Sequence, residues 1–312
     1  MHPDRILTGV ALMLGFCLTA PVIDVASKLA ASTIPVGQIT TARFVVQAAL
    51  MLPVCLALGF GLRMGRGVLG RLTLRALFLV LSTYSFVAAV QYMPIADALA
   101  IAFVEPFILL LLGYFIFNDQ VGSHRICACL VGFCGSLLVI QPSFAVFGLV
   151  ALWPLGTAVF FAAYMLVTRS LSGQMHPVPM QYHTATVATV LCLPVMLLAN
   201  GSGIASLDPV WPQSYEWLWL FGVGASSAVS HMLMTFALRF APSATLAPLH
   251  YLEIISASVM AYYVFGDFPN ALTWTGIGII AASGLYIIWR ERLAARLGKP
   301  VATALPPESP GP

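Results

Sequence analysis

Long apolar stretches alternate with short polar or Pro/Gly-rich breaks along the whole chain. A helix needs roughly 20 predominantly apolar residues to cross the hydrocarbon core of a bilayer. Stretches of about that length predict ten membrane-spanning helices, at residues 6–30, 36–60, 72–92, 95–117, 124–140, 147–169, 178–199, 216–238, 243–265 and 270–289. The pattern therefore predicts an all-α membrane protein.

Composition supports this prediction and excludes other classes of protein. The chain has 312 residues, of which 60% are hydrophobic and 8% are charged, and its mean hydropathy is +0.94. A soluble domain has about 25% charged residues. So few charges exclude a soluble enzyme or a nucleic-acid-binding protein, and the expected surroundings are a lipid bilayer.

Basic residues gather in alternate breaks between the predicted spans. If the N-terminus is cytoplasmic, twelve of the fourteen Lys and Arg residues fall in cytoplasmic segments: Arg5, Arg63, Arg66, Arg71, Arg75, Arg125, Arg169, Arg239, Arg290, Arg292, Arg296 and Lys299. Cytoplasmic loops of membrane proteins collect Lys and Arg in this way. An even number of spans then predicts that both termini are cytoplasmic, with residues 293–312 as a disordered, Pro-rich tail.

The chain also aligns with itself. An offset of 148 residues pairs Pro94 with Pro242, Glu105 with Glu253, Tyr114 with Tyr262, and Asp119 with Asp267. Five spans in each copy is an odd number, so the second copy would be inverted relative to the first. The sequence therefore predicts two inverted five-helix repeats, at residues 1–146 and 147–292. Such repeats are found in secondary transporters, with the substrate site near the midplane.

Charged residues inside predicted spans are the first candidates for a functional site. Each costs at least ~2.5–3.5 kcal/mol at the bilayer centre, so its default interpretation is functional. Glu105 precedes Pro106, which removes a backbone hydrogen bond and opens the helix beside the carboxylate. His250 lies three residues before Glu253, on the same helical face. An alternative is that both carboxylates only accept hydrogen bonds that hold the bundle together.

Three further charges and a polar stripe complete the candidates. Asp24 and Lys28 stand four residues apart, in the favourable order for an ion pair. With Arg43 they are expected to form an intramembrane charge network; a gate for an anionic or zwitterionic group is the alternative. Tyr84 and Gln91 are seven apart on one face of their span and are candidates for substrate binding.

Motifs that would indicate catalysis are absent from the sequence. The chain lacks a phosphate-binding Gly-x-x-x-x-Gly-Lys-Ser/Thr loop, a His-Glu-x-x-His motif and a Gly-x-Ser-x-Gly elbow. We therefore expect no enzyme, cofactor or metal. The cysteines, three of them at Cys127, Cys129 and Cys134, are expected to be buried thiols. His183 and His231 are expected to be core groups.

Two segments resemble a known family. Residues 94–142 resemble the fourth and fifth helices of EamA-type transporters of the drug/metabolite transporter superfamily. The run from Ala247 to Glu253, followed by Phe265-Gly266-Asp267, resembles the second EamA repeat. Within the superfamily, Tyr251-Leu252-Glu253 is similar to the S-adenosylmethionine-uptake and riboflavin-transporter branches. His250 stands where arginine is common in the family.

The resemblance implies a ten-helix permease of the bacterial inner membrane that moves a small organic metabolite. We expect alternating access about a midplane site lined by Glu105, His250, Tyr251 and Glu253. The expected substrate is riboflavin or another planar metabolite, with S-adenosylmethionine or an amino-acid-type metabolite as the alternative. A non-transporting intramembrane enzyme or scaffold subunit is the alternative from another class, and homodimerisation is left open.

Overall fold

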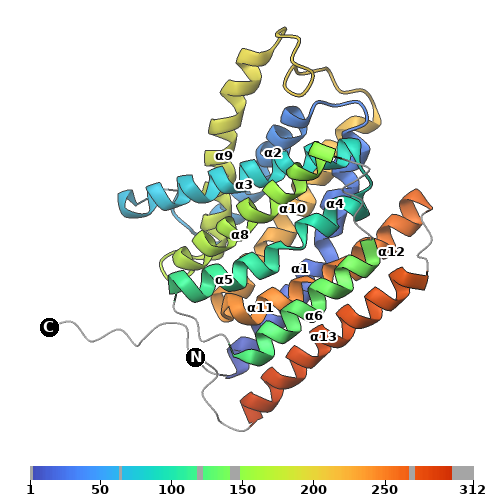
Figure 1. Ribbon diagram of the computed structural model, residues 1–312. Helices are drawn as coiled ribbons and strands as arrows, with labels where there is room; N and C mark the ends of the chain where they lie inside the picture. The colour runs from blue at the N-terminus through green and yellow to red at the C-terminus, as the bar shows by residue number, and fades with distance from the viewer. Residues whose placement is uncertain (1–2, 63–64, 118–121, 141–147, 267–270, 297–312) are drawn as a thin grey trace, which may run out of the picture.

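The computed structural model describes residues 3–62, 65–117, 122–140, 148–266 and 271–296, which contain helices and no strand. Figure 1 shows the helices as one crossing bundle in which α6 and α13 lie side by side. The bounds are α1 Pro3–Ala30, α2 Val36–Ala57, α3 Arg66–Tyr92, α4 Ile95–Ala102, α5 Glu105–Phe117, α6 Ser123–Ile140, the 3₁₀ turn η1 Gly148–Ala151, α8 Leu152–Ser172, α9 Pro177–Ala199, α10 Tyr215–Phe240, α11 Ser243–His250, α12 Glu253–Phe265 and α13 Ala271–Arg296.

Each predicted span corresponds to helical structure, but not all of them are single helices. Within the described part of the chain, six helices are long and apolar enough to cross a membrane. The spans predicted at 95–117 and 243–265 are each divided into two shorter helices. The last helix continues past residue 289 to Arg296, so the predicted tail does not begin at residue 293. Residues 297–312 lie outside the described residues, as do Asp119 and Asp267.

The two divided spans break immediately before a glutamate. In the first, α4 ends at Ala102 and α5 begins at Glu105; in the second, α11 ends at His250 and α12 begins at Glu253. Short bonds of the i→i+3 type bridge both breaks, for example from the Leu252 amide to the Leu249 carbonyl at 3.0 Å. At the first break, Pro106 has no N–H to give to the Ala102 carbonyl, which confirms the expected opening of the helix beside Glu105.

Helix packing follows a pattern that relates the two halves of the chain. The most extensive contacts are α1 with α10, α3 with α8, α6 with α13 and α2 with α9. The divided helices also pack alike, since α4 and α5 contact α8 while α11 and α12 contact α1. Helices α1, α2, α3 and α6 of the first half correspond to α8, α9, α10 and α13 of the second. Replacing each helix by its counterpart turns the contact of α1 with α10 into that of α8 with α3, and it leaves the contacts of α2 with α9 and of α6 with α13 unchanged. The bundle therefore has the same packing plan twice.

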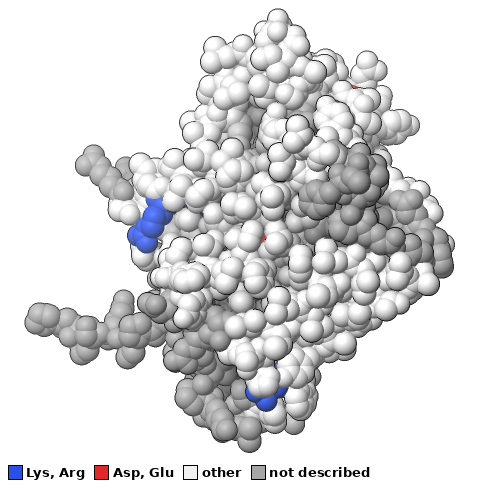
Figure 2. All heavy atoms as spheres, in the orientation of Figure 1, with Lys and Arg blue, Asp and Glu red and all other residues white. Residues whose placement is uncertain are grey.

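The molecular surface carries many exposed apolar side chains. Figure 2 shows one face almost free of Lys, Arg, Asp and Glu. Large side chains such as Leu198, 85% exposed at the end of α9, project outward. An apolar surface of this kind suits contact with lipid.

Two of the cysteines also lie on the surface. Cys127 and Cys134 are exposed, so the prediction that they are buried is wrong. Cys129 is buried, because a two-residue step along a helix turns it to a different face from Cys127.

Two basic residues assigned to cytoplasmic segments are buried instead. Arg75 lies within α3 and is fully buried, and Arg169 near the end of α8 is 9% exposed. Arg169 donates to the Ser243 hydroxyl at 2.6 Å and stacks on the Phe117 ring at 4.4 Å. Their burial removes both from the set of residues that mark the cytoplasmic surface.

Close contact between α2 and α10 depends on Gly224. A Cβ atom at this position would lie 2.4 Å from the Val46 Cβ and 3.0 Å from the Arg43 carbonyl oxygen, so one helix must move. We expect Gly224→Ala to destabilise the protein by about 1–3 kcal/mol, measured as thermal unfolding in detergent. Gly222→Ala on the same helix is the matched control, because its Cβ would meet nothing closer than 3.7 Å. Equal stability of the two variants would contradict this account.

Candidate functional site

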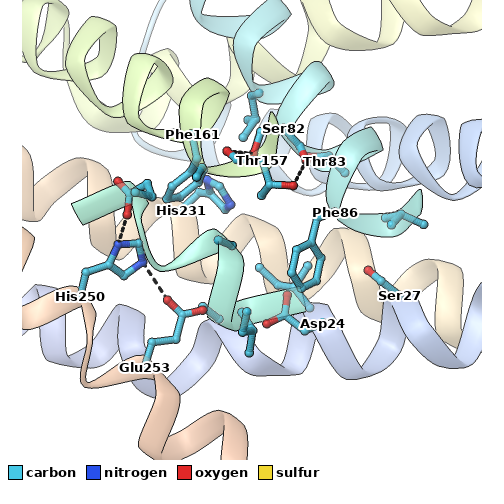
Figure 3. Close-up of a pocket in the computed structure, with 18 of the residues that line it drawn as sticks. Asp24, Ser27, Ser82, Thr83, Phe86, Thr157, Phe161, His231, His250 and Glu253 are labelled. Atoms are coloured by element: carbon cyan, nitrogen blue, oxygen red, sulfur yellow. Dashed lines mark hydrogen bonds and ion pairs between the residues drawn. The ribbon is translucent and has the colours of Figure 1, made fainter. Parts of the chain in front are cut away.

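A cavity of about 110 Å³ lies at the centre of the bundle, which is room for several water molecules. Residues from both halves of the chain line it, and they come from all helices except α6, α9 and α13. Four phenylalanines form apolar parts of the wall. The polar lining residues, most of them labelled in Figure 3, are Asp24, Ser27, Arg43, Ser82, Thr83, Glu105, Thr157, His231, His250 and Glu253.

His250 joins the two divided helices through their glutamates. Its Nδ1 lies 2.6 Å from Glu105 Oε2, and its Nε2 lies 2.8 Å from Glu253 Oε2. Figure 3 shows the ring between these two interactions. All three residues are at most 6% exposed. Two carboxylate acceptors facing both ring nitrogens favour the imidazolium form, which donates from both.

Aromatic rings surround the same histidine. The centroid of the His250 ring lies 5.2 Å from that of Phe16, 5.8 Å from that of Phe161 and 6.1 Å from that of Phe103. These apolar rings lower the local dielectric around the two ion pairs and strengthen their electrostatic attraction. The group formed by Glu105, His250 and Glu253 is therefore a buried, charged connection between the first and second halves of the chain.

Arg43 and His231 form a second polar group in the cavity wall. The guanidinium of Arg43 donates to the Thr83 hydroxyl and lies 2.7 Å from His231 Nε2. Since arginine can only donate, His231 accepts at Nε2 and carries its proton on Nδ1, which lies 3.1 Å from the Tyr164 hydroxyl. His231 is therefore neutral, and it holds the charge of Arg43 in a fixed position.

The Tyr164 hydroxyl connects this group to the buried Arg75. The Arg75 guanidinium donates to Tyr164 at 2.8 Å, to Thr168 at 2.8 Å, to Thr235 at 3.3 Å and to Thr184. It also lies 4.6 Å from the centroid of the Tyr164 ring. These hydroxyls come from α8, α9 and α10, so one side chain of α3 joins three helices of the second half of the chain.

Some of the predicted site residues do not reach the cavity. The centroid of the Tyr84 ring lies 5.9 Å from that of Trp153. Gln91 is exposed and lines a separate hollow beside residues 203–210. Tyr251 is fully buried against Gly132 of α6, with its hydroxyl 3.8 Å from the Cys129 sulfur. Lys28 donates to the Met93 carbonyl at 3.1 Å, one turn beyond Asp24, and is not in the cavity lining.

The structure therefore brings together Asp24, Arg43, Glu105, His250 and Glu253 from the predicted set. It adds His231, for which the sequence predicts a core position. Its position inside a predicted span was the available signal, because intramembrane ionisable residues are functional candidates by default. Among the described residues, no group of three His, Cys, Asp or Glu side chains is suited to hold a metal ion.

Comparison with known proteins gives consistent results over most of the chain. A model of the EamA-like transporter family matches residues 7–141 and 148–289. The S-adenosylmethionine uptake transporter of Rickettsia prowazekii (strain Madrid E) is 25% identical over 287 residues, which are 92% of this chain and 94% of that protein. The riboflavin transporter of Vibrio cholerae serotype O1 is 24% identical and covers 86% and 88% of the two chains.

A third relative is the pseudopaline exporter CntI of Pseudomonas aeruginosa (strain UCBPP-PA14), 26% identical over 88% of this chain and 93% of its own. A solved structure, described only as the crystal structure of a protein, superposes with a TM-score of 0.73. It is 18% identical and covers 94% of this chain and 99% of the solved one, so this likeness concerns the fold alone.

Proposed function

Because this chain belongs to the EamA-like transporter family, we propose that it is a secondary transporter, and not an enzyme, that moves a small organic metabolite across a bacterial inner membrane. The chain is a multi-pass membrane protein, and its curated relatives are bacterial transporters. One observation carries the proposal: charged side chains from both halves of the chain meet in a central cavity. A scaffold subunit would be closed by packed apolar side chains at this place.

The proposed architecture is ten membrane spans in two inverted five-helix repeats, residues 1–146 and 147–292. The repeated packing plan and the two helix breaks, each just before a glutamate, support it. Both termini are proposed to be cytoplasmic. The support is the distribution of Lys and Arg along the sequence, which persists when the buried Arg75 and Arg169 are left out.

Transport is proposed to occur by alternating access, with the two halves rocking about the cavity. Glu105, His250 and Glu253 lie where the halves meet, so a change in their ion pairs would accompany the movement. Asp24 and Arg43 line the same cavity and are proposed to contact the solute. Lys28, one helix turn from Asp24 on α1, is proposed to belong to the same charge network without lining the cavity.

Relatives suggest which solutes to test first. Riboflavin represents a planar metabolite, and S-adenosylmethionine represents an amino-acid-type metabolite. A bound substrate raises the melting temperature of the detergent-solubilised protein by mass action. Solutes that do so are then tested for counterflow in liposomes that contain the purified protein.

We expect any stabilising solute to be exchanged saturably by the wild-type protein and not by protein-free liposomes. A solute that raises the melting temperature through the central cavity but is never exchanged would contradict the transport function. That outcome would favour a receptor or scaffold instead.

A further inference from the structure

The walls of the central cavity carry opposite charges. One wall holds the carboxylates of Asp24, Glu105 and Glu253, from α1, α5 and α12. Arg43, held by Thr83 and the neutral His231, belongs to the other. In Figure 3, Thr83 and His231 lie on one side of the pocket, and Asp24, His250 and Glu253 lie on the other.

Each wall also has buried polar atoms without a hydrogen-bond partner among the described residues. On the acidic wall these are Asp24 Oδ2 and Glu105 Oε1, and on the basic wall Arg43 Nε. Buried polar groups are normally satisfied, and an unsatisfied charged group is costly to bury. Glu105 is 3% exposed and Arg43 is 5% exposed, so neither is satisfied by bulk solvent outside the cavity. The unused atoms are acceptors on one wall and a donor on the other.

The lining contains two cations, Arg43 and the imidazolium of His250, and the carboxyl groups of Asp24, Glu105 and Glu253. His250 is already engaged on both ring nitrogens, which leaves Asp24 and one oxygen of Glu105 for a further cation. Arg43 retains the geometry to bind a carboxylate, because its unused Nε belongs to a planar donor fork. The cavity is therefore complementary to a solute that carries both signs of charge.

We propose, on the basis of the transport function above, that the cavity binds a dipolar solute with an α-amino-acid head group. Its ammonium contacts the carboxylates of Asp24 and Glu105, and its carboxylate contacts Arg43. The remainder of the solute packs against phenylalanines in the wall, including Phe86 and Phe161. A planar solute without an ionic head group leaves the buried charges on both walls unpaired and is excluded.

The test is the binding of a matched series of solutes to the full-length, detergent-solubilised protein, measured by the ligand dependence of its melting temperature. S-adenosylmethionine and S-adenosylhomocysteine carry both charges of the head group, decarboxylated S-adenosylmethionine lacks the carboxylate, and 5′-methylthioadenosine lacks both. Riboflavin and the twenty standard amino acids complete the series. We expect loss of the carboxylate to weaken binding at least about tenfold, and 5′-methylthioadenosine and riboflavin not to bind.

A variant tests whether Arg43 is the residue that contacts the carboxylate of the solute. Arg43→Gln should remove the difference between S-adenosylmethionine and its decarboxylated form, a ratio that a general loss of stability would not change. If that variant does not fold, the solute series on the wild-type protein decides alone. Arg239→Gln is the matched control, since Arg239 is exposed at the end of α10 and should leave the ratio unchanged.

The proposal is overturned if riboflavin or 5′-methylthioadenosine binds as tightly as S-adenosylmethionine, or if no dipolar solute of the series binds. The transport function fails in a different way. Dipolar solutes that bind in the expected order without counterflow would remove the transport function and keep the binding site. Counterflow of riboflavin without binding of dipolar solutes would keep the transport function and remove the proposed binding site.

Discussion

Glu253→Gln is expected to reduce solute counterflow to the rate of protein-free liposomes, a loss of at least about tenfold. The carboxylate of Glu253 receives the Nε2–H of His250 at 2.8 Å in the central cavity, where the two halves of the chain meet. Glutamine keeps the size of the side chain but removes the charge that holds the imidazolium. In the proposed alternating access, the ion pairs can then no longer be exchanged between states, while His250 keeps its contact with Glu105 and the fold is retained.

The matched control makes the same substitution outside the cavity. Glu216 accepts the Gln213 amide at 2.5 Å near the start of α10 and takes no part in the cavity lining. Glu216→Gln should therefore exchange solute at the wild-type rate. A Glu253→Gln protein that melts like the wild type and also transports like it would show that the carboxylate has no part in transport.

His250→Ala is expected to lower the free energy of unfolding by about 3–5 kcal/mol. The substitution removes the only group that bridges Glu105 and Glu253 among the described residues, and it leaves two buried carboxylates without their counter-charge. Removing one partner of a buried ion pair costs more than removing the whole pair, because the remaining charge is still desolvated. Chemical or thermal unfolding in detergent measures the loss.

Two further proteins separate the charge effect from the loss of a ring. In the triple variant with Glu105→Gln and Glu253→Gln added to His250→Ala, none of the three positions carries a charge, and we expect most of the stability to return. His183→Ala removes a buried histidine of α9 that lies outside the cavity and should cost less. A triple variant as unstable as His250→Ala would mean that packing, and not charge, determines the cost.

The fold was largely predictable because the length of each apolar stretch can be read from the local sequence alone. Each predicted span lies on helical structure, and Pro106 identified the first break from its missing N–H. The second break, at Tyr251 and Leu252, has no proline at the equivalent place, and the only signal for it in the sequence is the internal repeat that pairs Glu253 with Glu105. Tertiary contacts around His250 accompany that break.

The candidate site was predictable only where its residues are close together in the sequence. The spacing of His250 and Glu253 predicted that they project together, and their 2.8 Å contact confirms it, although the predicted single helix is divided between them. The contact of His250 with Glu105 spans 145 residues of sequence and depends on the packing of α5 against α11. Tyr84 and Gln91 were expected on one face of their span, but periodicity does not say what that face contacts, and neither residue lines the cavity.

The ion pair between Glu105 and His250 also has a consequence for how the protein is made. Its partners are 145 residues apart in the chain, so at ~5–20 residues per second a ribosome needs about 7–30 s to synthesise the histidine after the glutamate. During that interval the segment containing Glu105 is already available for insertion into the bilayer while its partner does not yet exist. The central site can therefore be completed only after most of the second half of the chain has been synthesised.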